Sequence, residues 1–174
     1  MRLIISITGA SGVNLGEKFV KRLPKEIEKY IIFTKNSKIV FNKENQQNIF
    51  QESDISASIA SGSFKCDAMI IIPCSMNTLA KISCGIADNL TTRTASVMIK
   101  EQRKLILAPR EMPFSAIALE NMLKLSKLQV IIAPPIIGYY SEPKSIDDME
   151  NFLIGKWFDL LGIDHELFKR WGEE

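Results

Sequence analysis

The sequence predicts an α/β domain in which a parallel sheet is covered by helices on both faces. Apolar runs without internal alternation are typical of strands buried on both sides. Segments with apolar residues at helical spacing separate these runs. Polar side chains follow the ends of the runs, and in a parallel sheet those ends share one edge, where ligands bind.

The first half of the chain begins with a buried strand over residues 2–7. A helix follows over residues 15–23, and Pro24 ends it because proline cannot continue a helix. A second strand is predicted over residues 29–34. Residues 38–49 favour another helix, although polar residues fill its centre.

The second half repeats this alternation. Strands are predicted over residues 67–75, 104–109 and 129–135. Helices are predicted over residues 76–87, 93–102, 115–128 and 145–162. The helix at 115–128 has the clearest amphipathic pattern, with an apolar face formed by Leu119, Met122, Leu123 and Leu128. Ser145 and Asp148 resemble a capping box at the start of the last helix, with Asp in place of Glu.

Composition limits the possible functions. The chain has 174 residues, 46% of them hydrophobic, which suits one domain over residues 1–174 with a substantial core. A formal charge of +2 argues against a nucleic-acid surface. Three cysteines without C-x-x-C spacing argue against a disulfide framework or a zinc site and favour reduced thiols in the cytoplasm. We expect no signal peptide and no membrane span.

The turn after the first strand, "TGASG", has the composition of an anion site. Its glycines allow backbone angles that side chains forbid, and they let the main chain approach a ligand. The turn leads into a helix N-terminus, which favours a phosphate, and Ser11 adds a hydroxyl donor. The spacing matches neither G-x-G-x-x-G nor a Walker A loop. A tight turn without a ligand is therefore the alternative.

Three further strand ends should share the same edge of the sheet. Thr34 and Lys35 follow the second strand, Ser75, Asn77 and Thr78 follow the third, and "APREMPFS" follows the fourth. "SMNT" at a helix start could be simple capping. The convergence of several such ends favours a shared, phosphate-bearing ligand.

Longer motifs identify the family that the chain resembles. "TGASG", "SASIASGSF", "PCSMNTLAKIS" followed by "GIADNL", "IKEQRKLILAPREMPFS", "LENMLKL" and "YYSEPKSIDD" are similar to the UbiX-type flavin prenyltransferases, also called 3-octaprenyl-4-hydroxybenzoate or phenylacrylic acid decarboxylases. The resemblance runs over nearly the whole chain, including the "RWGE" ending.

The resemblance implies a flavodoxin-like three-layer sandwich, usually assembled as a dodecamer with sites between subunits. It implies a metal-independent transferase that joins a dimethylallyl group from dimethylallyl phosphate to N5 and C6 of reduced flavin mononucleotide (FMN). The product, prenylated FMN, would be the cofactor of a UbiD-type decarboxylase.

The resemblance also assigns residues to this reaction. FMN contacts are expected at Gly9, Ala10, Ser11, Thr34, Ser75, Met76, Asn77, Thr78 and Arg110. Donor phosphate contacts are expected at Lys100, Arg110, Tyr140 and Lys156, where the family usually has Arg at the last of these. Catalytic roles are expected for Ser11, Glu44, Lys100, Glu111 and Trp171: the glutamates near the reacting centre, and Trp171 in the apolar wall around the prenyl chain.

Each of these residues also has an ordinary structural interpretation. By itself, Lys100 or Lys156 would be read as a solvated helix charge. Glu111 and Arg110 could form only an ion pair, Tyr140 could cap a loop, and Trp171 could be plain packing. Two rival functions are an FMN carrier and a flavin-dependent cysteine decarboxylase. The second needs an active-site His, and the single His, His165, lies in a tail-like segment.

Overall fold

The computed structural model describes residues 1–9, 11–34 and 48–172. The chain divides into two compact units, Met1–Pro134 and Pro135–Glu174. The first unit contains the sheet, and the second contains the last helix and the C-terminal segment. A single flavin-binding domain over the whole chain stays a prediction.

The sheet of the first unit is parallel throughout its described strands, in the order β3-β2-β1-β4-β5-β6. The strands are β1 (Arg2–Ile7), β2 (Glu28–Phe33), β3 (Ile49–Gln51), β4 (Ala68–Cys74), β5 (Lys104–Pro109) and β6 (Ile131–Ile132). All seven residues of β4 are buried, as are most of β1 and β5. Burial on both faces accounts for their continuous apolar sequences.

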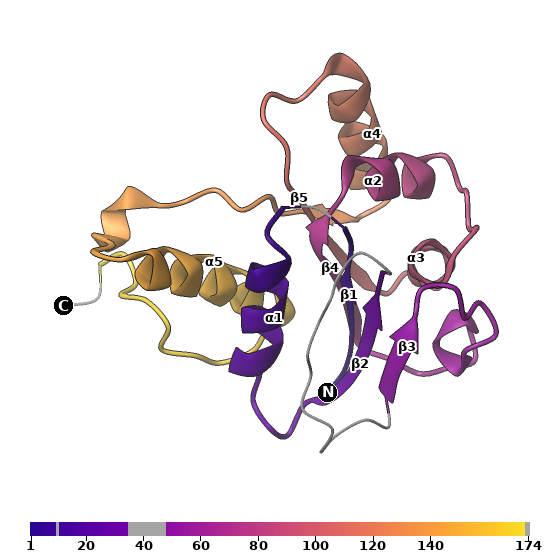
Figure 1. Ribbon diagram of the computed structural model, residues 1–174, viewed down its shortest axis with the longest axis horizontal. Coiled ribbons are helices and arrows are strands. Elements are labelled where there is room, and N and C mark those ends of the chain that lie inside the picture. The colour runs from indigo at the N-terminus through magenta and orange to yellow at the C-terminus, as the bar shows by residue number, and fades with distance from the viewer. Residues whose placement is uncertain (10, 35–47, 173–174) are drawn as a thin grey trace. The chain divides into compact units, whose positions relative to one another are not determined.

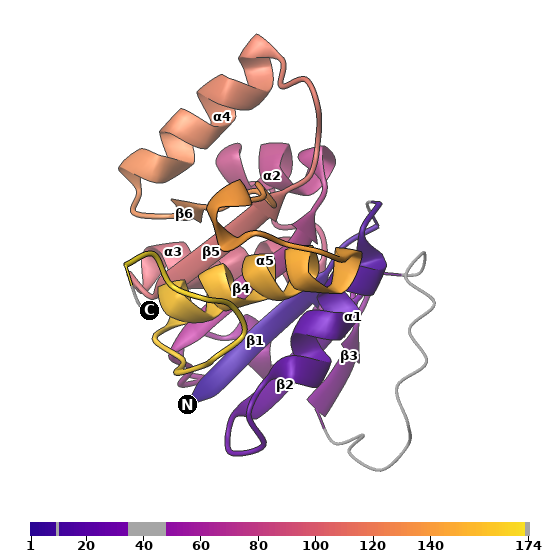
Figure 2. The same cartoon turned by 90° about the vertical axis from the view of Figure 1, so that its left-hand side faces the viewer.

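Helices cover both faces of this sheet, as predicted. They are α1 (Val13–Arg22), α2 (Met76–Ser83), α3 (Leu90–Lys100) and α4 (Ala116–Lys127). Figures 1 and 2 show α1 on one face and α2 with α3 on the other. Without the short edge strand β3, the strand order is that of flavodoxin-like folds, so the predicted fold class is confirmed.

Several element boundaries differ from the prediction: α2 ends at Ser83 rather than at residue 87, and β6 comprises Ile131–Ile132 rather than residues 129–135. Two further differences have local reasons. The predicted helix at 38–49 lies largely outside the described residues, and its last residue, Ile49, belongs to β3. Helix α3 begins three residues before the predicted position. Asn89 caps it: the Asn89 side chain accepts a hydrogen bond from Thr92 N at 2.9 Å, and the Thr92 hydroxyl is 3.3 Å from Asn89 N.

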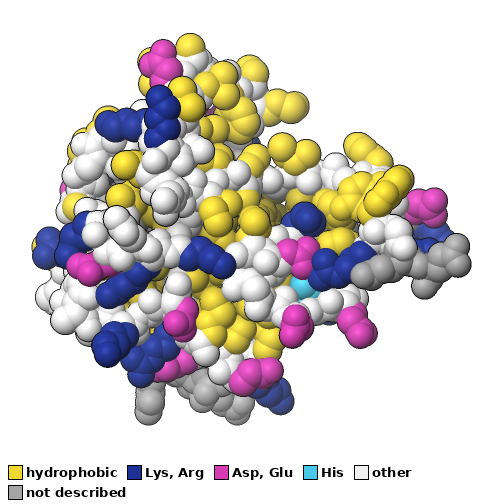
Figure 3. All heavy atoms as spheres, turned by 180° about the vertical axis from the view of Figure 1, so that it is seen from behind, with side chains coloured by type: hydrophobic (Ala, Val, Ile, Leu, Met, Phe, Trp, Pro, Cys, Tyr) yellow, Lys and Arg dark blue, Asp and Glu magenta, His cyan; other side chains and the backbone are white. Residues whose placement is uncertain are grey.

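The apolar face predicted for α4 is only partly buried. Met122 is 9% exposed, whereas Leu119, Leu123 and Leu128 are each more than half exposed. The buried side chains of α4 are Ala118, Met122 and Leu125. Hydrophobic side chains are consequently visible over α4 in the space-filling view (Figure 3). In a single copy of the chain, three of the four residues of the predicted apolar face are therefore exposed.

The second unit is built around α5 (Ile146–Leu161). Ser145 caps this helix by accepting a hydrogen bond from Asp148 N at 3.1 Å. The reciprocal arm of the predicted capping box reaches one residue further back, because the Asp148 carboxylate accepts from Lys144 N at 3.0 Å. Gly162 ends the helix in the left-handed conformation. None of the described helices is long and apolar enough to cross a membrane.

Candidate functional site

The candidate site lies at the carboxyl edge of the sheet, where β1 separates β2 from β4. This is the topological switch point, at which the connections leave in opposite directions and a ligand-binding crevice is expected in sheets of this kind. Thr8 joins the ends of β1 and β4 at this point. Its buried hydroxyl donates to the carbonyl oxygen of Pro73 at 2.8 Å and accepts from Ser75 N at 2.9 Å. The predicted site did not include Thr8, although it belongs to the "TGASG" motif.

The first turn presents a helix N-terminus to this crevice. Gly9 and Ser11 are exposed, whereas Ala10 lies outside the described residues. Gly12 has φ 106°, a backbone angle that favours glycine, and no side chain in the described part of the chain caps α1. The first N–H groups of α1 therefore have no side-chain acceptor and suit an anion.

Gly16, one turn into α1, brings the helix close to the sheet. A Cβ atom at this position would lie 2.5 Å from the carbonyl oxygen of Ile72 and 3.3 Å from Ile7 Cγ1. Because no side chain fits there, α1 is held directly against β4. Gly16 thus sets the position of the helix N-terminus, a role that the sequence analysis missed.

The predicted contacts after β4 act partly as a helix cap. The Ser75 hydroxyl accepts a hydrogen bond from Thr78 N at 3.2 Å and lies 2.9 Å from the Thr78 hydroxyl. Met76 is half-buried and Asn77 is exposed. The capping interpretation of "SMNT" is confirmed, and capping holds these polar groups at the rim of the crevice.

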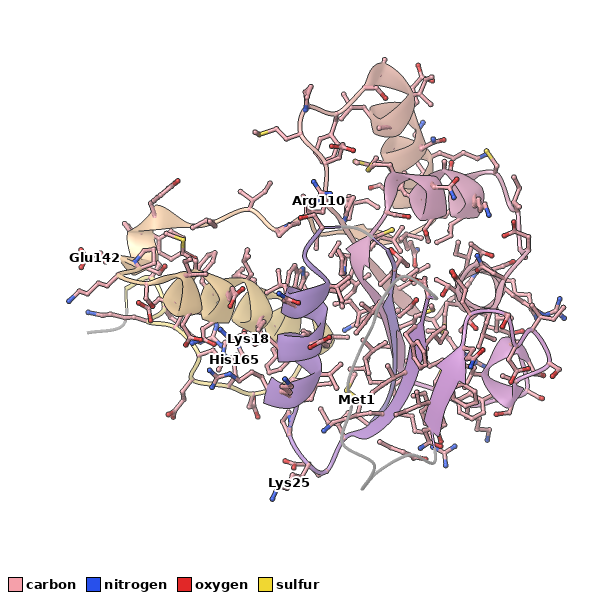
Figure 4. The ribbon with its side chains drawn as sticks, viewed as in Figure 1. Met1, Lys18, Lys25, Arg110, Glu142 and His165 are labelled. Carbon is pink, nitrogen blue, oxygen red and sulfur yellow. The ribbon has the colours of Figure 1, made fainter. Side chains whose placement is uncertain are left out.

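Thr34 and Arg110 lie at the ends of the neighbouring strands. Thr34 is buried, and its N–H donates to the carbonyl oxygen of Ile7 at 3.4 Å. Arg110 N donates to the carbonyl oxygen of Cys74 at 3.3 Å, while its side chain is exposed beyond the strand ends (Figure 4). Burial raises the pKa of the Cys74 thiol, so this sulfur is a neutral group and no nucleophile.

Glu111 follows Arg110 in an exposed loop. Its carboxylate accepts a hydrogen bond from Met112 N at 3.1 Å. No ion pair joins Glu111 to Arg110 among the described residues, so the ion-pair interpretation has no support here. Glu44 lies outside the described residues.

Lys100 is at the other edge of the sheet. It ends α3, which leads into the amino end of β5, whereas Arg110 follows the carboxyl end of the same strand. Six strand residues span about 20 Å. One copy of the chain therefore does not bring Lys100 beside Arg110.

Lys100 borders a groove of about 510 Å³ between α3 and residues 55–62. Arg93, two turns earlier on α3, borders the same groove, together with hydroxyl groups of Ser56, Ser61 and Ser96. Lys100 forms a contact ion pair with Glu101, and this hydrogen bond holds the pKa of the Glu101 carboxyl below its usual value. Arg93 was not among the predicted site residues. Its seven-residue spacing from Lys100 on a helix was the signal that could have found it.

The second unit contains the remaining predicted residues. The Tyr140 and Trp171 rings meet edge to face, with centroids 5.6 Å apart, and Tyr140 makes a similar contact with Phe152 at 5.5 Å. Lys156 is half-exposed on α5, with its Nζ 3.8 Å from Asp159 Oδ2. The structure thus brings Tyr140 and Trp171 together. In the described part of the chain, no three His, Cys, Asp or Glu side chains form a group that could hold a metal.

Comparisons with known proteins agree with this geometry. The sequence model of a family described as Flavoprotein matches residues 1–157. The chain is 49% identical over 185 aligned residues to the flavin prenyltransferase UbiX of Helicobacter pylori (strain ATCC 700392 / 26695), an alignment that covers 99% of each chain.

Two solved structures are similar over almost the whole chain. The dodecameric FMN-dependent UbiX-like decarboxylase from Escherichia coli O157:H7 has a TM-score of 0.92 and 38% identity, with 98% of this chain and 99% of that chain covered. AnUbiX (PadA1), solved in complex with FMN and dimethylallyl pyrophosphate, has a TM-score of 0.90 and 35% identity, with 99% and 98% covered.

Proposed function

The chain belongs to the flavoprotein family and, within it, to the UbiX flavin prenyltransferases, and we propose on this premise that it transfers a dimethylallyl group from dimethylallyl phosphate to reduced FMN. The observation that carries the proposal is the set of polar groups at the carboxyl ends of β1, β4 and β5. They are an α1 N-terminus without a side-chain cap, the hydroxyls of Ser75 and Thr78, and the exposed Arg110 side chain.

The crevice residues fit FMN. The N–H groups at the start of α1 and the Ser11 hydroxyl are donors for the FMN phosphate. The polar groups after β4 and the Arg110 guanidinium are donors for the flavin ring. Reduced FMN supplies N5 as the nucleophile and C6 as the second position to be alkylated. The chain holds that ring at the strand ends and limits its motion relative to the donor.

Cations are needed because phosphate leaves an allylic carbon during the transfer. The departing anion has to be stabilised where its charge develops. Arg110 can bind it with two parallel N–H donors, and Lys100 supplies a point charge. Since one copy places these residues at opposite edges of the sheet, we propose that Lys100, with Arg93 beside it, reaches the site from a neighbouring copy.

In the second unit, Tyr140 and Lys156 keep their predicted roles as donor ligands. Tyr140 offers a hydroxyl and Lys156 an ammonium group to the phosphate. Lysine lacks the planar fork of the arginine usual in the family, so its grip on the phosphate is less directional. The exposed Trp171 ring offers a π-face to the cation-like allylic carbon.

Ring closure at C6 requires a proton donor for the prenyl alkene and a base for the C6 proton. We assign the base to Glu111, whose carboxylate stands in the exposed loop beside Arg110. The released phosphate is an alternative base. Glu44 and Ser11 keep their predicted roles, with Glu44 as the proton donor or as the group that orients Ser11.

The assembly and the partners belong to the same proposal. We propose a homo-oligomer, as in the dodecameric relative, that works in the cytoplasm without a metal. The product, prenylated FMN, would pass to a UbiD-type decarboxylase.

The two rival functions have less support. A cysteine decarboxylase needs a catalytic His, but His165 Nε2 is 3.1 Å from the Asp159 carboxylate and its side chain is 4% exposed. An FMN carrier has no use for the basic groove that contains Arg93 and Lys100.

An anaerobic assay tests the function. The protein is incubated with reduced FMN and either dimethylallyl phosphate or diphosphate, and the flavin is analysed by mass spectrometry. We expect a flavin that is heavier by one prenyl unit. Recovery of unmodified FMN with both donors would contradict the proposal and favour the carrier.

A further inference from the structure

Asp159 on α5 is the centre of a polar cluster in the second unit. Arg170 binds it with two N–H groups: Nη2 lies 2.7 Å from Oδ1 and Nη1 lies 3.2 Å from Oδ2. His165 Nδ1 accepts a hydrogen bond from Leu167 N at 3.1 Å, which leaves the ring proton on Nε2 to donate to Asp159. These bonds tie the C-terminal segment to α5, below which His165 is labelled in Figure 4.

Aromatic contacts continue from this cluster to the predicted prenyl wall. The Phe168 ring packs on Phe152 with centroids 5.0 Å apart, and Phe152 in turn meets Tyr140 at 5.5 Å. Gly155 makes room for this arrangement, because a Cβ atom there would lie 2.6 Å from the Phe168 ring. Trp171 completes the series against Tyr140. Because Arg170 directly precedes Trp171, its bond to the carboxylate determines where the indole lies.

The Trp171 indole is placed without being buried. It is 81% exposed, so burial of apolar surface contributes little to holding it. The ion pair below it is partly buried, with the Arg170 and Asp159 side chains 38% and 25% exposed. Besides joining the C-terminal segment to α5, this pair holds the residue that precedes an exposed aromatic ring. A fixed, exposed aromatic face suits a surface that a ligand covers.

We propose that Arg170 and Asp159 are positioning residues, which hold Trp171 beside Tyr140 so that the two rings form a wall for the dimethylallyl group. This inference rests on the proposed function. Neither residue touches the donor; both act through Trp171. Arg170 also lies closer to Asp159 Oδ2 than Lys156 does, at 3.2 Å against 3.8 Å, and so leaves the Lys156 ammonium available to the phosphate.

The position of the indole can be measured without any turnover. The full-length protein is labelled with 5-fluorotryptophan, and Trp157, which is 2% exposed, provides an internal reference for the fold. In Arg170→Gln we expect the fluorine resonance of Trp171 to sharpen and move toward that of the free amino acid, while the Trp157 resonance stays in place. Lys169→Gln, which removes a neighbouring exposed cation, should leave both resonances unchanged.

The kinetic consequence should fall on the donor. We expect Arg170→Gln and Asp159→Asn to raise KM for dimethylallyl phosphate about fivefold, and to change KM for reduced FMN by less than about twofold. Arg170→Lys keeps the positive charge but loses the planar pair of N–H donors, so its KM for dimethylallyl phosphate should lie between those of wild type and Arg170→Gln. The double variant should have a KM for the donor no higher than that of Asp159→Asn alone, because the Arg170 bond is already weakened in that single variant.

The outcomes separate this inference from the proposed function. A Trp171 resonance that does not move in Arg170→Gln overturns the positioning role, and so does an unchanged KM for the donor in an active protein. If wild type does not prenylate FMN, the proposed function fails, and the prenyl wall fails with it even if the fluorine spectrum confirms the cluster. If Arg170→Gln does not fold, which the Trp157 resonance would reveal, Arg170→Lys and Asp159→Asn decide by the same two measurements.

Discussion

At the scale of the residue, the candidate site depends on small groups that leave room or make one hydrogen bond. Thr8 uses one hydroxyl to join the ends of β1 and β4, and Gly16 lets α1 touch the sheet. Neither carries a charge or an evident chemical role. The sequence predicted Ser11, Ser75 and Arg110 from their chemistry, but it gave no comparable signal for residues that act by position.

Gly16→Ala should weaken both the fold and FMN binding. The added methyl group would lie 2.5 Å from the Ile72 carbonyl oxygen, so α1 has to move away from β4. Overpacking of this kind costs about 1–3 kcal/mol of unfolding free energy, measurable by urea denaturation. Fluorescence titration should show weaker FMN binding. Lys21→Ala, at an exposed position of the same helix, is the control, and equal effects from both variants would contradict the close-approach role.

Glu52→Gln should stabilise the protein at neutral pH. Burial raises the pKa of the Glu52 carboxyl, opposed by the Lys81 charge and reinforced by Asp88. Because the folded-state pKa lies above the unfolded value of about 4.3, Glu52 costs stability as pH rises through its folded pKa. The variant should have the higher Tm at pH 7, and the difference should vanish below about pH 4. A lower Tm at pH 7 would show that the Glu52 charge is favourable in the fold.

At the scale of the element, most of the fold could be predicted because long apolar runs and capping residues are local signals. β1 and β5 have the predicted bounds, and Ser145 begins its helix with the predicted side-chain hydrogen bond, whereas the Asn89 cap of α3 was missed. β3 was missed because three residues at a sheet edge carry too little pattern. The apolar pattern of α4 predicted the helix, but a pattern does not say whether its apolar side chains are buried within one copy, and Leu119 and Leu123 are not.

Helices α3 and α4 are each followed, one residue after the C-cap, by a residue that has a left-handed backbone and is not glycine. Gln102 has φ 52° and Gln129 has φ 64°, and both border a cavity of about 480 Å³ near the amino end of β5. Such positions favour glycine because a Cβ atom is strained there. We expect Gln102→Gly and Gln129→Gly each to raise the unfolding free energy by about 0.5–1 kcal/mol, after allowance for the more flexible unfolded chain.

Thermal and denaturant unfolding would measure the two substitutions, singly and combined. Because the two glutamines border the same cavity, a double variant whose effect departs from the sum of the single effects would reveal coupling between them. The kcat for FMN prenylation should not change in Gln129→Gly, because this position lies at the edge of the sheet opposite the strand ends that are proposed to hold FMN. Gln102 lies two residues after Lys100, so Gln102→Gly is judged by unfolding alone. Lys127→Gly, inside the last turn of α4, is the matched control and should destabilise by about 1 kcal/mol. A loss of stability in both Gln variants would mean that the glutamine side chains make contacts that outweigh the strain.

At the scale of the whole molecule, a linear sequence names site residues without saying which copy supplies them. The resemblance assigned Lys100 and Arg110 to one phosphate, and the fold places them at opposite ends of β5. Exposed apolar side chains on α4, including Leu119 and Leu123, are consistent with a chain that buries further surface in an assembly. Both observations concern relations between copies, which periodicity and motif spacing do not encode.

Mixed oligomers give the sharpest test of a site that two copies share. Lys100→Ala and Arg110→Ala should each lose most prenylation activity, because each removes a charge that stabilises the leaving phosphate. When the two variants are dissociated and reassembled at equal amounts, half of the sites receive an intact Arg110 and half of those an intact Lys100. About a quarter of the wild-type activity should therefore return.

Recovery can be interpreted because the Lys100→Ala chain still supplies Arg110 and the Arg110→Ala chain still supplies Lys100. The double variant mixed with either single variant cannot rebuild a complete site, so it should recover nothing, and native mass spectrometry would confirm that the copies have exchanged. If exchanged oligomers of the two single variants stay as inactive as their parents, Lys100 and Arg110 act within one copy or not at all. Because the fold separates the two residues by the length of β5, that result would remove Lys100 from the phosphate site.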